Sequence, residues 1–168
     1  ENMHPLRMIS ALAPTLILII YVLLSKRTSS FINALDLGKL TLLHSIRIPV
    51  ELVLYALFIY KTIPEIMTFA GRNYDIMAGI TAPIIYYVAY IRKSLNKDLE
   101  LAWNFISLFL LLNIIIYAVL SLELPFQQFG LDQPNRAIRY FPFIWLPSIV
   151  VPIVLFSHLA TIKHLIRK

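Results

Sequence analysis

The sequence contains no cysteine and few charged residues. None of its 168 residues is cysteine, which excludes disulfides, thiol chemistry and thiolate metal sites. Charged residues make up 14% of the chain, whereas 59% is hydrophobic, and the mean hydropathy is +0.76. A soluble domain of this length needs more polar surface. The shortage of charge therefore indicates a membrane protein.

The chain also lacks the features of a nucleic-acid-binding protein. Its net charge is +6, but few aromatic residues accompany the basic clusters and no nucleic-acid motif is present. Lysine and arginine instead flank long apolar stretches, where basic residues set the topology of membrane proteins. We therefore expect the lipid bilayer, and no nucleic acid, as a partner.

Apolar stretches of membrane-spanning length recur along the chain. A helix needs about 20 apolar residues to cross a bilayer. Five stretches come close to this length: residues 6–25, 40–62, 75–92, 100–122 and 142–165. The sequence therefore predicts an all-α fold, a polytopic integral membrane helix bundle of five transmembrane helices that forms one domain over residues 1–168.

Basic residues are concentrated in alternate connections between these spans. They lie between spans one and two, between spans three and four, and at the end of the chain: Lys26, Arg27, Lys39, Arg92, Lys93, Lys97, Lys163, Arg167 and Lys168. With five spans these regions share one side, and positive charge favours the cytoplasm. We expect the amino terminus outside and the carboxyl terminus in the cytoplasm. No small-x-small cleavage pattern follows the first span, so we expect it to be retained.

Proline lies inside four of the five predicted spans, at Pro14, Pro49, Pro83, Pro147 and Pro152. Each proline removes a backbone hydrogen bond and tends to kink its helix. Such kinks either shape helix packing or create the broken helices on which transporters build binding sites.

The loops expected on the outer side contain start signals for short interfacial helices. Pro64 predicts such a helix over 64–70. Asp132 and Pro134 predict another over 134–140, lying along the membrane surface. The aromatic residues around this second segment suit a membrane interface.

The second span carries ionisable side chains at membrane depth. At 100° per residue, His44, Arg47 and Glu51 lie within about 60° of one another. A charge at the bilayer centre costs about 3 kcal/mol, so this face should point toward other helices or water. Polar residues on other spans are candidate partners. The predicted intramembrane polar site comprises His44, Arg47, Glu51, Tyr55, Tyr86, Asn104 and His158.

A second polar set lies in the outer loops. It comprises Arg72, Asn73, Asp75, Asp132, Asn135, Arg136 and Arg139. These residues are either solvated loop charges or a site for an anion or lipid headgroup. Asp75 is also expected to cap the start of the third span.

Three kinds of function are compatible with the intramembrane site. The favoured one is a transporter or channel-like protein, in which Glu51 or a histidine carries protons or a cation. Alternatively, Arg47 and Glu51 form a buried ion pair in a structural or regulatory subunit. A haem-binding or intramembrane enzyme is the third, with His44 and His158 as haem ligands, although the sequence has no CxxCH or HExxH motif. The sequence identifies no catalytic residue, metal site or cofactor, and it leaves open a small-molecule or ion substrate and a homo-oligomer.

Overall fold

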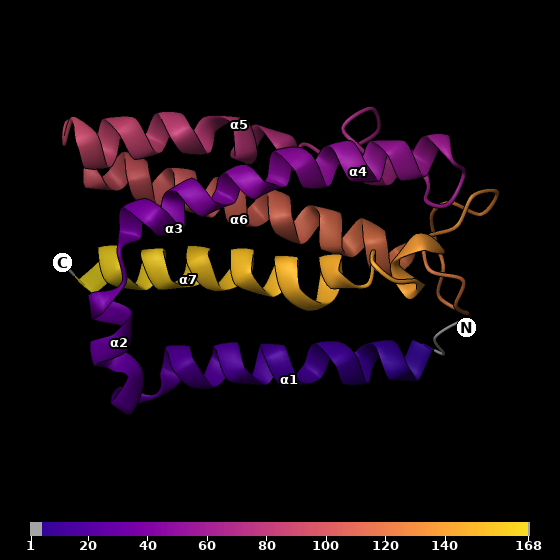
Figure 1. The fold of residues 1–168 in the computed structure, drawn as a ribbon, viewed down its shortest axis with the longest axis horizontal. Coiled ribbons are helices and arrows are strands. Elements are labelled where there is room, and N and C mark those ends of the chain that lie inside the picture. The colour runs from indigo at the N-terminus through magenta and orange to yellow at the C-terminus, as the bar shows by residue number, and fades with distance from the viewer. Residues whose placement is uncertain (1–4, 168) are drawn as a thin grey trace.

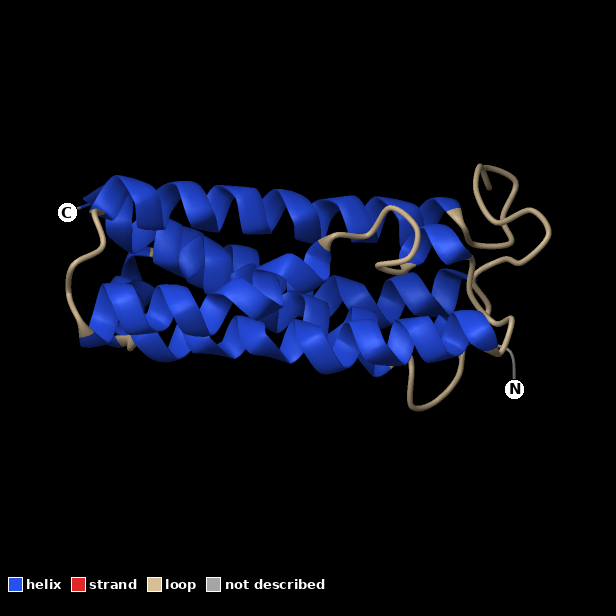
Figure 2. Cartoon of the chain, turned by 90° about the horizontal axis from the view of Figure 1, so that it is seen from above, coloured by secondary structure: helices blue, strands red, loops and turns tan. Residues whose placement is uncertain are grey.

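The computed structural model describes the backbone of residues 5–167, and the side chains of residues 13–167 except those of Lys26 and Ser29. It is 73% helical, and the described residues form no strand. The longer helices lie along one axis, the short helix near residues 29–34 runs across it, and most of the loops lie near the two ends (Figures 1 and 2). The predicted all-α fold is confirmed.

The described chain contains seven α-helices joined by shorter helical turns. The α-helices are α1 (Pro5–Leu24), α2 (Ser29–Ala34), α3 (Leu37–Leu43), α4 (Arg47–Ile59), α5 (Asp75–Tyr86), α6 (Lys97–Leu120) and α7 (Val151–Arg167). The 3-10 turns are η1 (Lys26–Thr28), η2 (His44–Ile46), η3 (Glu65–Met67) and η5 (Ala137–Arg139), and the π segments are η4 (Tyr87–Ile91) and η6 (Leu146–Val150). We call the end of the bundle that holds α2 the α2 end, and the opposite end the loop end (Figure 1).

Three helical stretches in the described part of the chain are long and apolar enough to cross a membrane. They are Leu37–Ile59, Lys97–Leu120 and Leu146–Arg167, and they coincide with the second, fourth and fifth predicted spans. Shorter apolar helices, Ala13–Leu24 and Asp75–Ile91, lie where the first and third spans are predicted. The structure is therefore a helical bundle with three candidate membrane spans.

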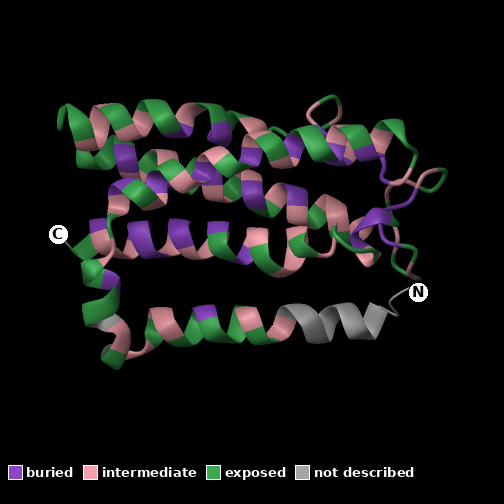
Figure 3. Cartoon of the chain, in the orientation of Figure 1, coloured by how far each residue is buried: buried purple, intermediate pink, exposed green. Residues whose placement is uncertain are grey.

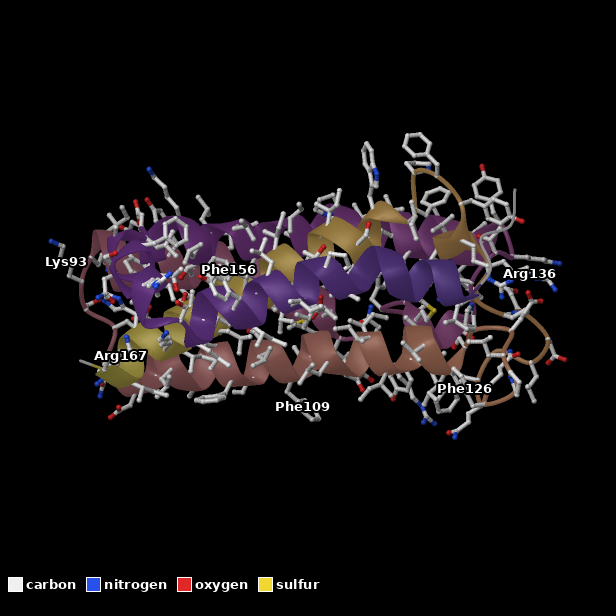
Figure 4. All side chains as sticks on the ribbon, turned by 90° about the horizontal axis from the view of Figure 1, so that it is seen from below. Lys93, Phe109, Phe126, Arg136, Phe156 and Arg167 are labelled. Atoms are coloured by element: carbon white, nitrogen blue, oxygen red, sulfur yellow. The ribbon has the colours of Figure 1, made fainter. Side chains whose placement is uncertain are left out.

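The outward faces of this bundle are apolar. Residues on these outward faces are exposed (Figure 3), and Phe109, a large hydrophobic residue that is 69% exposed, points away from the other helices (Figure 4). Lys93 and Arg167 lie at the α2 end, whereas Arg136 lies at the loop end (Figure 4). An apolar belt between charged ends is typical of a protein embedded in lipid.

Proline breaks the second span beside its polar residues. Pro49 has no backbone N–H, so it cannot donate to the carbonyl of Ser45 four residues earlier. The chain tightens into the 3-10 turn η2 just before this point, between α3 and α4. The break therefore lies at the level of the predicted intramembrane site.

The segment between α4 and α5 turns back into the bundle. Helix α5 begins beside the start of α4 and partway along α6, rather than at the loop end (Figure 1). The Asn113 side chain donates to the Arg72 carbonyl at 3.1 Å, and Asn113 lies about 10 Å before the end of α6 at 1.5 Å per residue. Irregular backbone at this depth is tolerated when it is buried in protein or lines a cavity.

Small residues allow α5 to approach α4 closely. Ala78, Gly79 and Ala82 are buried on one face of α5. A Cβ on Gly79 would lie 3.0 Å from Ile48 Cγ1 and 3.2 Å from Arg47 Cβ. Glycine at this position therefore lets the two helices meet beside Arg47, as expected for helix contacts in membranes.

The predicted short outer helices are smaller than expected. The segment 64–70 contains only the turn η3, and 134–140 contains only η5. Ile138 in the second segment is 5% exposed and packs with Leu122. The turn at η5 is therefore held by protein contacts.

Candidate functional site

A buried ion pair joins α4 to α5. Arg47 is 2% exposed and Asp75 is 4% exposed. Nη1 of Arg47 donates to Oδ1 of Asp75 at 2.7 Å and to the Ser107 carbonyl of α6 at 3.1 Å. The alternative in which Arg47 pairs with Glu51 is therefore wrong, because Asp75 is the counter-ion.

Arg47 also determines the protonation of His158 on α7. Nη2 of Arg47 lies 2.7 Å from Nε2 of His158, and a guanidinium group can only donate. Nε2 must therefore accept, which leaves the proton on Nδ1. Nδ1 lies 3.0 Å from Oδ1 of Asn104, whose amide nitrogen donates to the Glu100 carbonyl at 3.0 Å. The hydrogen bonds thus define a neutral His158 with its proton directed at Asn104.

His44 is held in the other neutral tautomer. The Ser157 hydroxyl donates to the Leu40 carbonyl at 2.9 Å. The same oxygen lies 3.2 Å from Nε2 of His44, so it accepts the proton that Nε2 carries. The His44 ring stacks on the His158 ring with centroids 3.9 Å apart. The Trp103 ring contacts the His44 ring in a T-shaped arrangement, with centroids 5.6 Å apart.

The two histidines do not fit a haem iron. A bis-histidine haem has its porphyrin between the two rings, with each ligand nitrogen directed at the iron. Here the rings are nearly parallel, 16° apart, and in direct contact. No group of three or more histidine, aspartate or glutamate side chains in the described residues could hold a metal ion.

Glu51 is buried one helical turn from Arg47 and faces the returning segment. It is 1% exposed, and its Oε1 accepts from the Asn73 amide. That amide also donates to the Met67 carbonyl at 3.0 Å, while its oxygen accepts from the backbone N–H of Asp75 at 3.1 Å. Asn73 thus fixes Glu51 relative to the start of α5. Oε2 of Glu51 has no partner in the described part of the chain.

An apolar cavity begins at these charged groups. Its volume is about 190 Å³, and Arg47, Glu51 and Asp75 line one end. The rest of the wall is hydrophobic and comes from α1, α4, α6, α7 and the segments η3, η5 and η6: Leu16, Val50, Leu54, Met67, Leu111, Ile114, Ile115, Ala118, Val119, Ile138, Leu146, Pro147, Val150, Val151, Pro152, Val154 and Leu155. The cavity surface is therefore almost entirely apolar, with three charged side chains among the residues that line it.

The buried network does not include every residue predicted for it. His44, Arg47, Asn104 and His158 lie together, and Glu51 lies at the cavity end of the cluster. Two predicted members lie elsewhere. Tyr55 stacks on Phe69 at 4.8 Å, and Tyr86 stacks on Tyr90 at 6.1 Å.

The predicted outer-loop set divides between different environments. Asn73 and Asp75 belong to the buried network. Asp75 does not cap α5, because Tyr74 occupies the cap position and the Asp75 side chain binds Arg47. Asn135 is fully buried and donates to the Ala118 carbonyl at 3.1 Å, whereas Arg72 and Asp132 are exposed.

The remaining outer-loop arginines bind an acid that the sequence prediction omitted. Nη2 of Arg136 lies 2.6 Å from Glu123, and Nη2 of Arg139 lies 3.1 Å from it. The hydrogen bond from Arg136, aided by the charges of both arginines, lowers the pKa of the Glu123 carboxyl. These charges therefore neutralise one another in part and tie η5 to the end of α6.

These observations define an all-helical protein with three helices long and apolar enough to span a membrane, and with a buried charged site beside an apolar cavity. The chain belongs to the family described as "Domain of unknown function (DUF8737)", which it matches over residues 5–166. No curated protein and no solved structure matches the chain.

Proposed function

We propose that the protein is a small membrane transporter whose substrate occupies the apolar cavity beside Arg47, Glu51 and Asp75. The observation that carries this proposal is the cavity itself, about 190 Å³ in volume, with hydrophobic walls and three charged side chains among its lining residues. Small-molecule sites commonly have this composition, because apolar walls supply affinity and a few polar groups fix orientation.

The architecture around the cavity supports transport. A broken helix, η2 with α4, and a returning segment meet at the charged end. Transporters use discontinuous helices in this way to place polar groups near the bilayer midplane. Leu16 and Val119, which line the wall, are 38% and 41% exposed, so the cavity reaches the lipid-facing side of the bundle.

The proposal includes a five-span topology. In addition to the three long apolar helices, α1 and α5–η4 cross the membrane as shorter or proline-containing spans. The third span is short. The returning segment before α5 compensates for this, because its irregular backbone, instead of a helix, occupies the outer part of the bilayer. The amino terminus is then outside and the carboxyl terminus in the cytoplasm.

Single cysteines test this topology without a background, because the chain has none of its own. Ser30, Asn96 and Gln128 are exposed and are replaced one at a time. An impermeant thiol reagent added to intact cells should label Gln128→Cys and spare Ser30→Cys and Asn96→Cys. Labelling of Asn96→Cys from outside would overturn the topology.

Cavity filling tests the substrate site. Ala118→Phe places a phenyl ring in the cavity, whereas Ala102→Phe adds the same ring to an exposed position on the same helix. The neutral probe neopentylbenzene is equilibrated with protein in nanodiscs, and binding is counted as the excess over empty nanodiscs. We expect Ala118→Phe to abolish this excess and Ala102→Phe to preserve it. Equal binding by both variants would refute the site.

Transport is tested separately, with charged solutes that cross lipid slowly. Proteoliposomes are supplied with benzyltrimethylammonium or with phenylmethanesulfonate, so that the test does not depend on the sign of the substrate charge. Uptake of either solute should exceed that of empty liposomes and should be lost in Ala118→Phe but not in Ala102→Phe. No uptake of either solute would reduce the proposal to binding alone and overturn the transport function.

A further inference from the structure

We propose that the cavity takes a hydrophobic organic cation of the ammonium type, which binds Glu51 in exchange for a proton. This inference rests on the proposed function and adds the class of substrate and the ion that it exchanges. It follows from the charge balance of the buried groups, the unpartnered oxygen of Glu51 and the chemistry of the cavity wall.

The charged groups at the end of the cavity do not balance. Arg47 supplies one positive charge, while Asp75 and Glu51 are two carboxyl groups. Asp75 already neutralises Arg47 at 2.7 Å. His158 is neutral by its hydrogen bonds, and a charged His44 would lie buried beside Arg47 with no acceptor for Nδ1, so neither histidine is a counter-ion for Glu51. A buried carboxylate without a counter-ion takes up a proton, since the ionised form is too costly in apolar surroundings.

The groups that face Glu51 are few. Arg47 comes from its own helix, and Asp75 and the Asn73 amide come from the returning segment and α5. His158 from α7 and His44 lie beyond Arg47. In the described part of α6, the titratable Glu100 binds the Tyr90 hydroxyl toward the α2 end. A cation entering the cavity therefore meets Glu51 as the acidic group that is free to ionise.

Glu51 has the geometry of a ligand-binding group. Asn73 occupies Oε1, and Oε2 has no partner although the side chain is 1% exposed and lines the cavity. A cationic nitrogen that approaches the Glu51 carboxylate forms an ion pair, which is strong in a low-dielectric site. Its hydrocarbon part then lies along Leu54, Leu111 and Val154, which are buried apolar residues of the wall.

The exchange conserves charge and atoms. The protonated carboxyl of Glu51 loses its proton to solvent, the carboxylate that forms pairs with the incoming ammonium ion, and no covalent bond to carbon changes. One proton leaves for each cation that binds. On release of the cation, the carboxylate takes a proton back and the cluster is again balanced.

Other ligand classes fit the site less well. An anion would face two carboxyl groups, and the Arg47 groups that could receive it already bind Asp75, His158 and the Ser107 carbonyl. A metal cation requires several oxygen ligands, whereas the wall is hydrophobic and no group of three or more metal-binding side chains exists in the described residues. A cation with a hydrocarbon body uses both parts of the site.

The test compares two probes of the same shape. Benzyltrimethylammonium carries a fixed positive charge, and neopentylbenzene is its neutral carbon isostere. Binding of each to protein in nanodiscs is measured for the parent, Glu51→Gln and Glu65→Gln, the last being an exposed control. We expect Glu51→Gln to weaken cation binding about tenfold to a hundredfold and to leave neopentylbenzene binding unchanged. Glu65→Gln should change the binding of neither probe.

Proton release supplies a second measurement that needs no variant. In weakly buffered solution, the parent protein should release one proton per benzyltrimethylammonium bound. The dissociation constant of the cation should fall about tenfold for each unit rise in pH while Glu51 is protonated. Cation binding without proton release would overturn the exchange.

The outcomes separate this inference from the proposed function. If neopentylbenzene binds and Ala118→Phe removes it, but the cation does not bind or ignores Glu51→Gln, the cavity is a substrate site and the cation inference is wrong. If neither probe binds above empty nanodiscs, the substrate site itself is wrong, and the inference falls with it.

Discussion

Replacing the two buried carboxyl groups singly and together tests how the charges are divided. The variants are Asp75→Asn, Glu51→Gln and the double variant, all of which preserve side-chain size. Asp75 is the counter-ion of Arg47 at 2.7 Å, whereas Glu51 binds the Asn73 amide. The structure therefore predicts that the two single substitutions lower the free energy of unfolding by different amounts. It also predicts that the effect of each substitution depends strongly on whether the other is present.

The magnitudes follow from the partners that each change removes. Glu51→Gln keeps an oxygen that accepts from Asn73, so we expect a loss of less than about 1 kcal/mol in the free energy of unfolding. Asp75→Asn strands Arg47 in part, but the neighbouring Glu51 can ionise in its place, and we expect a loss of about 1–3 kcal/mol. The double variant leaves Arg47 without any carboxylate, which costs about 3–5 kcal/mol. The coupling between the two positions is then about 1–2 kcal/mol.

Unfolding by dodecyl sulfate in mixed micelles gives these free energies, with the exposed Asp132→Asn and Glu65→Gln as matched controls. We expect both controls to lie within about 0.5 kcal/mol of the parent. If Glu51→Gln alone cost as much as the double variant, Glu51 would be the counter-ion of Arg47. If the losses in the free energy of unfolding from the two single variants simply added, Glu51 would not ionise in place of Asp75. Either result refutes the charge assignment.

Three further predictions concern the supports of the site. Because its folded pKa is lowered below the ordinary 4.5, Glu123 stabilises the loop above about pH 4.5; the protection of the η5 amides against hydrogen exchange, relative to their intrinsic exchange rates at each pH, should decrease as pH falls below that value, and Glu123→Gln should abolish this dependence. Asn73→Ala leaves the buried Glu51 carboxyl and a backbone N–H without a hydrogen-bond partner, so the free energy of unfolding in mixed micelles should fall by about 2–4 kcal/mol. An unchanged free energy of unfolding would exclude a role for the returning segment in holding Glu51. Gly79→Leu should cost about 1–3 kcal/mol by overpacking against Ile48, whereas Ala102→Leu on an exposed surface should not.

The helical fold was predictable because hydrophobic length and periodicity depend on local sequence. The long, mainly apolar stretch at 100–122 became α6, and Pro49 predicted a disturbance that the structure places at η2. The short helix α2 was not predicted, because its six residues contain neither an apolar repeat nor a strong cap. The outer turns were predicted too long, since their proline and aspartate signals mark where a turn begins and do not fix its length.

The polar site was only partly predictable, because helix periodicity places residues on a face without identifying the facing residue. His44, Arg47 and Glu51 do lie on one buried face. Asp75 and Asn73 were assigned to the outer loops, since a polar run before an apolar span ordinarily lies in water. A useful signal existed: Asp75 shares a helical face with Gly79 and Ala82, and small residues indicate helix contact. The return of residues 64–74 into the bundle depends on tertiary contacts such as Asn113 with Arg72.

Structural stability alone does not explain Glu51. The pair of Arg47 with Asp75, together with His158 and the Ser107 carbonyl, already joins α4, α5, α6 and α7. Glu51 adds a second buried carboxyl whose Oε2 has no partner, and an unsatisfied buried polar atom costs about 1–3 kcal/mol. A hydrophobic residue of similar size would remove that cost and would leave the ion pair intact. A group that costs stability and faces a cavity is best explained by a ligand that satisfies it, and a cation with an apolar body is the ligand that both ends of this cavity accommodate.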